Sequence, residues 1–256
     1  MSPTAVGLAG MLALLVLLFA RMPIGLAMAL VGAVGISVLN SPQAALNSLG
    51  AFPYSHASVQ AFAVIPLFVL MGNFAAVSGM GKDLYAAAYA WLGHRRGGLA
   101  SATVLACAGF AALSGSSVAS AVTMGRVCLP EMSRYAYDPR LATGVIAAGG
   151  TLGILIPPST VLVVYALLTE ESIGRLFLAG FLPGLLLTAL FVLTVALLCT
   201  LRPNLGPPGA ALPMRERFAA LGGAAPFILV VAVTIGGIYA GVFTVNEAAA
   251  VGALLT

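Results

Sequence analysis

Long apolar segments separated by short polar interruptions dominate the pattern of the chain. A bilayer core of about 30 Å requires roughly 20 apolar residues per helix, so the pattern predicts an all-α polytopic membrane protein. The apolar runs cover residues 3–20, 22–39, 57–78, 97–113, 117–133, 140–169, 174–201 and 218–241, and a further run opens at Thr244.

Several helix starts are marked by side chains that can cap a helix. Ser2, Ser41 and Asp138 each precede a proline, which is favoured at the first helical position. Thr244 is followed three residues later by Glu247, which is the spacing of a capping box. We therefore expect helices to begin at these four places.

The first informative interruption is Ser114-Gly115-Ser116-Ser117, between two uncharged apolar arms. Hydroxyls and free backbone groups are costly in hydrocarbon unless they line a cavity. The arms are short and rich in Gly, Ala and Ser, which suits close helix packing more than lipid contact. We predict a re-entrant helical hairpin over residues 97–135. Two full spans joined by an outer loop remain the alternative.

The second interruption lies within residues 140–169, a run too long for one comfortable span and too short for two. Its centre holds Gly149-Gly150-Thr151-Leu152-Gly153, followed by Pro157-Pro158-Ser159. Tandem prolines remove two backbone donors and disfavour helix just before them. We predict one helix broken near the middle of the membrane, and two consecutive broken elements are typical of a transporter site.

The composition agrees with a membrane protein, because 61% of the residues are hydrophobic and only 7% are charged, against about 25% charged in soluble domains. The net charge is +4, but the sequence has no stripe of basic residues interleaved with aromatic residues. Nucleic acid is therefore not an expected partner. With the N-terminus outside, every Lys and Arg except Arg175 falls at the inner surface. We therefore expect a periplasmic N-terminus in a bacterial inner membrane.

These features divide the chain into five expected regions. The last run stops at Thr256, well short of a full span, so we expect a truncated copy of a longer protein. The regions are scaffold-type helices with an interfacial helix (residues 1–96), the re-entrant hairpin (97–135), the broken helix and the following span (136–201), a proline-rich cytoplasmic linker (202–217) and the start of a second repeat (218–256).

A broken helix exposes carbonyls at the end of its first half and N–H groups at the start of its second half. The carbonyls and nearby hydroxyls suit a small cation, and the helix start at Ser116 suits a carboxylate. No Asp or Glu lies near either break, which disfavours a proton relay. The candidate substrate contacts are Ser116, Ser117, Thr123, Gly150, Thr151, Pro157 and Ser159.

The segments 114–119, 123–125 and 148–159 resemble the large membrane subunit of the tripartite ATP-independent periplasmic (TRAP) transporters. Residues 243–250 are similar to the opening of that family's second repeat, although a proline-threonine pair is more usual where Val245-Asn246 stand. The resemblance covers the whole chain.

This resemblance implies a permease with two inverted repeats and an elevator-like motion, driven by sodium and needing no other cofactor. It also implies import of an organic acid anion such as a C4-dicarboxylate or sialic acid. The implied partners are a periplasmic substrate-binding protein, a small four-helix membrane subunit and the lipid bilayer. The implied sodium ligands are the hydroxyls of Ser114 and Ser117 and the carbonyls of Gly153, Ile156 and Pro158. A second sodium site would lie in a second hairpin beyond residue 256.

Other classes of function fit the sequence less well. A stand-alone sodium–carboxylate symporter of similar architecture would need no binding protein. An intramembrane serine protease acting through Ser114 would need a membrane-embedded histidine, and His56 and His94 both sit in polar stretches. A channel is disfavoured because the sequence shows no ring of charge or filter motif.

Overall fold

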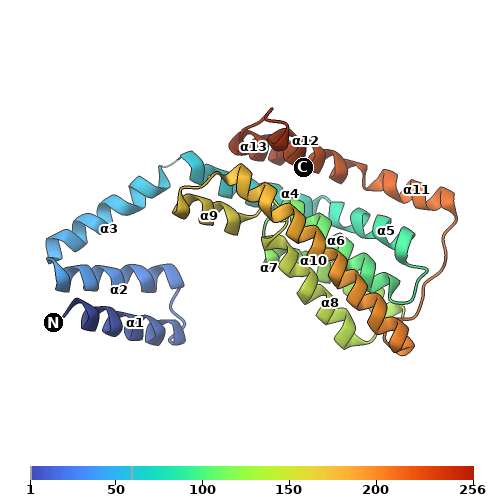
Figure 1. Ribbon diagram of the computed structural model, residues 1–256, viewed down its shortest axis with the longest axis horizontal. Helices are drawn as coiled ribbons and strands as arrows, with labels where there is room; N and C mark the ends of the chain where they lie inside the picture. The colour runs from blue at the N-terminus through green and yellow to red at the C-terminus, as the bar shows by residue number, and fades with distance from the viewer. Residues whose placement is uncertain (1, 59) are drawn as a thin grey trace. The chain divides into compact units, whose positions relative to one another are not determined.

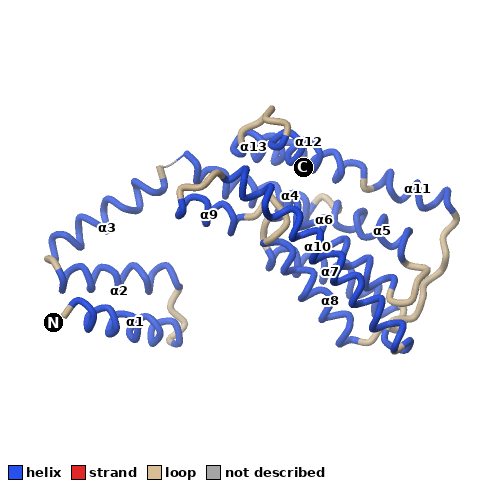
Figure 2. Tube along the Cα trace, viewed as in Figure 1, coloured by secondary structure: helices blue, strands red, loops and turns tan. Residues whose placement is uncertain are grey.

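The computed structural model describes residues 2–58 and 60–256, and every regular element within them is helical (Figures 1 and 2). Two compact units are formed, residues 1–62 and 63–256. The α-helices are α1 (Pro3–Phe19), α2 (Ile24–Leu39), α3 (Pro42–Ala57), α4 (Val64–Val77), α5 (Met80–Leu92), α6 (Gly98–Ser114), α7 (Ser117–Arg134), α8 (Pro139–Thr151), α9 (Thr160–Thr169), α10 (Ile173–Leu201), α11 (Met214–Gly223), α12 (Ala225–Tyr239) and α13 (Val245–Leu255).

The first unit consists of α1, α2 and α3, in which each helix packs on the next along the chain. The predicted cap at Ser2 is confirmed, since its hydroxyl accepts a hydrogen bond from the N–H of Ala5 at 3.3 Å. Large apolar side chains of α1 and α2 are exposed, among them Leu12 and Val34. Exposure of this kind is what a lipid-facing helix shows.

By length and hydropathy, α10 alone among the described helices can cross a bilayer unaided. Two further spans arise if each bent pair is counted as one, namely α4 with α5, bent by 65°, and α11 with α12, bent by 53°. The remaining apolar helices are 10–17 residues long. The continuous run expected over residues 218–241 is thus two helices that meet at Ala224.

The core of the second unit is built around α6, most of whose residues are buried. Helices α4, α5, α7, α8 and α10 all pack on it (Figure 1). Close approach depends on small residues: a side chain at Gly149 of α8 would meet the Cys107 Cβ of α6 at 2.9 Å. The small-residue composition of the hairpin arms therefore serves helix packing, as expected.

The boundaries of these units differ from the expected regions. The division falls after Phe62 instead of after residue 96, because α4 and α5 pack directly on α6. In the expected linker 202–217, helix α11 already begins at Met214. Its first residues, Arg215 and Glu216, are good helix formers that follow a proline, which explains the earlier start.

Residues 202–213 are held to the second unit by backbone hydrogen bonds. Gly206 accepts from the N–H of Gly97 at 2.9 Å, and Leu205 accepts from the N–H of Asp138 at 3.0 Å. The segment thereby ties the end of α10 to the base of the hairpin and to the start of α8. Its backbone thus holds the ends of these helices together.

Candidate ion and solute site

The predicted helical hairpin is formed by α6 and α7, which pack on each other. Helix α6 ends at Gly115, whose φ of +58° is a left-handed conformation that glycine adopts without strain. Ser116 then caps α7, since its hydroxyl accepts from the N–H of Ala119 at 3.4 Å. The two helices are thus joined by a tip of only two residues, Gly115 and Ser116.

The predicted break in the second element is also confirmed. Helix α8 ends at Thr151 and tightens into a 3-10 turn over Leu152–Ile154. The backbone is irregular up to Ser159, which caps α9 by accepting from the N–H of Leu162 at 3.3 Å. The same hydroxyl donates to the carbonyl of Ile154 at 2.8 Å. One serine therefore ends the break and starts the next helix.

The hairpin tip and the break lie against each other. Thr160, the first residue of α9, donates both its N–H and its hydroxyl to the carbonyl of Gly115, at 3.2 Å and 3.0 Å. A side chain at Gly153 would approach the Ser116 carbonyl oxygen to 2.7 Å. A side chain at Gly115 would approach the Pro158 carbonyl oxygen to 2.8 Å. Only glycine at these two positions permits so close a contact.

Two serines are buried inside the hairpin next to the tip. The hydroxyls of Ser114 and Ser120 are 2.7 Å apart, and either can be the donor. Ser114 is 3% exposed and Ser120 is fully buried. Because a buried hydroxyl without a partner is costly, this pair fixes the last turn of α6 against the first turn of α7.

Most carbonyls of the break have no donor. Within the described residues, the oxygens of Leu152 and Ile154 accept hydrogen bonds, whereas those of the other five residues do not, namely Gly153, Leu155, Ile156, Pro157 and Pro158. The three oxygens that the resemblance assigns to sodium, those of Gly153, Ile156 and Pro158, are among these five. Carbonyl oxygens without a donor are suitable ligands for a hard cation.

The hairpin also presents a helix start. In the part of the chain that the structure describes, neither the N–H of Ser117 nor that of Val118 has a hydrogen-bond partner. Ser116 and Ser117 are half-buried. Free N–H groups and the helix dipole make such a terminus attractive to an anion.

The structure separates the other candidate substrate contacts into two groups. Gly150, Pro157 and Ser159 are buried in the contact between tip and break. Thr123 is half-buried on α7, and Thr151 is exposed, with its hydroxyl bonded to the Ala148 carbonyl of its own helix at 2.6 Å. The first group is inaccessible to solvent in this part of the chain, whereas Thr123 and Thr151 are at least partly accessible.

Sequence reasoning missed Ser120 and Thr160. Ser120 lies four residues after Ser116 on the same face of α7, so its approach to the tip follows from helical spacing. Thr160 carried no comparable signal, because a threonine after a capping serine can also bond within its own helix. Its link to Gly115 depends on how two distant segments pack.

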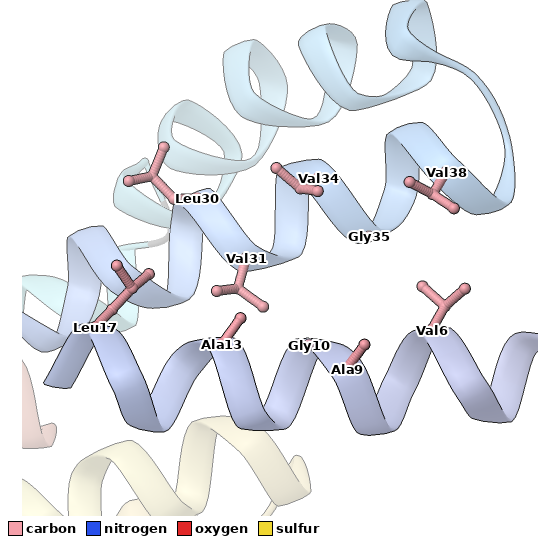
Figure 3. A pocket seen from close by; sticks show the side chains of 10 residues that line it. All are labelled: Val6, Ala9, Gly10, Ala13, Leu17, Leu30, Val31, Val34, Gly35 and Val38. Carbon is pink, nitrogen blue, oxygen red and sulfur yellow. The ribbon is translucent and has the colours of Figure 1, made fainter. Parts of the chain in front are cut away.

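A separate apolar cavity of about 400 Å³ lies between α1 and α2. Figure 3 shows that its lining side chains come from these two helices, with Val6 facing Val38 and Ala13 facing Val31. All its lining residues are aliphatic or glycine, so it offers no group to orient a polar solute.

A short hairpin whose tip is bonded to a broken helix, in a highly apolar helical chain, is the arrangement expected of a membrane transporter. The family described as the tripartite ATP-independent periplasmic transporter, DctM component, matches residues 11–256. The chain belongs to this family, which confirms the resemblance seen in the sequence.

Curated relatives agree with this assignment. The chain is 44% identical over 190 residues to a C4-dicarboxylate TRAP transporter large permease protein of Pseudomonas aeruginosa, covering 74% of the chain and 44% of the relative. It is 42% identical over 205 residues to a protein of the same description from Rhodobacter capsulatus, covering 74% and 46%.

A sialic acid TRAP transporter large permease protein of Vibrio cholerae is 34% identical over 243 residues, covering 93% of the chain and 55% of the relative. The chain thus spans about half the length of the curated relatives that it matches.

Proposed function

We propose that this chain forms the first half of a sodium-coupled permease that imports an organic acid anion. The observation that carries the proposal is the bonded contact between Thr160 and Gly115, which brings the hairpin tip and the break into one site. A periplasmic binding protein would deliver the anion, and a small membrane subunit would brace the permease, as family membership implies.

The site supports coupling because ligands of both kinds lie on adjoining segments. Free carbonyls of Gly153, Ile156 and Pro158 suit sodium, and the free N–H groups at the start of α7 suit a carboxylate. A cation and an anion held close together each favour the binding of the other. Coupling of this kind needs no ionised side chain at the break.

For the transported solute we propose a C4-dicarboxylate. Relatives described as C4-dicarboxylate permeases are 42–45% identical to the chain, whereas the sialic acid relative is 34% identical. A dicarboxylate has two carboxylates, one of which can be held at the start of α7. The second would require groups from the part of the protein beyond Thr256.

The coupling ion is tested by Ser117→Ala in the full-length protein, reconstituted in vesicles with its small subunit and binding protein. Within the described residues the Ser117 hydroxyl has no hydrogen-bond partner, so its removal costs the fold little. We expect the sodium concentration for half-maximal uptake to rise several-fold. Ser133→Ala, a change on the exposed far end of α7, is the matched control and should leave uptake unchanged.

An unaltered sodium dependence in Ser117→Ala would remove this hydroxyl from the ligands. Uptake that proceeds equally well without the binding protein would favour the stand-alone symporter. Competition assays with succinate and sialic acid on the same vesicles decide the class of solute. Preference for sialic acid would contradict the dicarboxylate assignment and leave the sodium proposal intact.

A further inference from the structure

A second polar feature lies away from the hairpin tip, at the opposite end of α8. A groove of about 540 Å³ runs between the start of α8 and the end of α10. We call it the α8–α10 groove. Its principal lining residues are Arg140, Leu141, Gly144, Val145, Leu198 and Arg202.

The groove has one charged end and a largely apolar wall that includes Thr194. Arg140 is the second residue of α8 and Arg202 directly follows α10, so both guanidiniums belong to the same end. Leu141, Val145 and Leu198 line the remainder. An apolar trough with two positive charges at its mouth fits an amphiphile with an anionic head group.

The two arginines remain available for such a ligand. The carboxylate of Asp138, which also lines the groove, is used as a helix cap and accepts from the N–H groups of Arg140 and Leu141 at 2.8 Å and 3.4 Å. Neither guanidinium forms a salt bridge with any residue in 2–58 or 60–256. Asp138 offsets one of the two positive charges, so these three side chains leave the mouth with a net charge of about +1 and with both guanidiniums outside any ion pair.

The length of the groove matches one leaflet of a bilayer. Its wall on α10 extends from Phe191 to Arg202, which at 1.5 Å per residue is roughly 16 Å. Half of a hydrocarbon core is about 15 Å thick. With the arginines at the membrane surface, an acyl chain could lie along the apolar wall as far as the middle of the bilayer.

We propose that the α8–α10 groove binds one anionic phospholipid. Arg140 and Arg202 hold its phosphate, and Leu141, Val145 and Leu198 pack against one acyl chain. Basic pockets between membrane helices bind anionic head groups by the same combination of charge and apolar contact. The bound lipid would link α8, which leads to the break, with α10, and this role does not depend on the identity of the transported solute.

The charged end is tested with the full-length protein, purified in detergent and stripped of lipid. Native mass spectrometry and thermal unfolding are recorded with phosphatidylglycerol, with phosphatidylethanolamine and with inorganic phosphate. We expect retention of phosphatidylglycerol over the other two. Each arginine near a membrane surface contributes about fivefold to such binding. The double variant Arg140→Gln/Arg202→Gln should therefore bind roughly 25-fold more weakly, and Arg215→Gln should bind normally.

The apolar wall is tested by Gly144→Leu, which keeps both charges. A side chain at Gly144 meets open space, so the leucine fills the groove without a clash. We expect loss of the retained lipid, with an unfolding temperature in lipid-free detergent that is unchanged or higher, since leucine favours a helix more than glycine does. Gly222→Leu, also in open space but on α11, is the control and should retain the lipid.

Three results would overturn the proposal. Equal retention of the two phospholipids would show that the arginines do not select charge. A stabilising effect of inorganic phosphate alone would indicate a soluble anion as the ligand. Unchanged phosphatidylglycerol binding in both groove variants would show that the lipid binds elsewhere, with the groove covered by another part of the full-length protein.

Discussion

The contact between the hairpin tip and the break is sensitive to a single methyl group at Gly153. In Gly153→Ala the new Cβ would lie 2.7 Å from the Ser116 carbonyl oxygen and 2.9 Å from the Ser117 nitrogen. Both neighbours are backbone atoms, so no side-chain rotation relieves the clash. The tip and the break must separate by several tenths of an ångström.

The cost follows from measured overpacking of protein interiors, which is about 1–3 kcal/mol. Separation of the tip from the break relieves this strain but moves the Gly153 carbonyl away from the hairpin. Part of the binding free energy of sodium is then used to bring the tip and the break together again. The apparent dissociation constant of sodium should rise by a factor of about 5 to 150, which corresponds to this energy.

The assay is sodium-dependent thermal unfolding of the purified full-length protein, with uptake in vesicles as the second readout. Gly125→Ala, also on the hairpin, is the matched control, because its Cβ would make an ordinary contact of 3.7 Å with Ile146 of α8. The control should bind sodium normally and unfold at the same temperature or higher. Normal sodium affinity in Gly153→Ala would refute the assignment of this contact to the ion site.

Two further predictions concern hydrogen bonds near the hairpin. Thr160→Val removes the hydroxyl bond to Gly115 but keeps the backbone bond, so we expect a loss of about 0.5–1.5 kcal/mol in stability and weaker sodium binding. Thr143→Val, which removes a bond within α8, should leave sodium binding unchanged. Tyr137→Phe leaves the buried N–H of Leu99 without its partner at 3.1 Å, which should cost about 1–3 kcal/mol in thermal unfolding. Burial raises the pKa of Tyr137 from 10.0 to about 12, partly offset by the Leu99 hydrogen bond. Because the folded state holds this proton more tightly, stability should fall between pH 10.0 and about 12, and the decline should be smaller in Tyr137→Phe.

Both breaks could be predicted from the sequence because their causes are local. Pro157 and Pro158 cannot continue a helix, and Gly115 adopts the left-handed conformation that ends α6. The capping box of Thr244 and Glu247 is likewise formed as expected. In each case the signal and the structure that it causes lie within a few residues of each other.

Features that depend on packing between distant segments could not be predicted in this way. The bond from Thr160 to Gly115 joins residues 45 positions apart, and neither residue type requires the other. The bend at Ala224 is a different case, because Gly222, Gly223 and Pro226 beside it are local helix-breaking residues, whereas hydropathy alone treats residues 218–241 as one continuous run. Hydropathy measures the preference for lipid and contains no information on helix direction.

The strength of the hydrogen bonds between the tip and the break determines how far an ion could shift their contact. Two neutral hydrogen bonds from Thr160 hold the tip to the break, each with a net value of only about 0.5–1.5 kcal/mol. Bonds of this strength make a contact that is weak enough to be shifted. Suppose that an ion binds only when the carbonyls of Gly153 and Pro158 face the tip. The free energy by which it stabilises the closed contact then equals the difference between its binding free energies for the closed and the open arrangement. A change from one-tenth to nine-tenths closed needs roughly a hundredfold difference in affinity. Backbone ligands can supply this difference because they move with the helix ends to which they belong. The affinity for the ion therefore depends directly on whether the hairpin tip and the break are in contact.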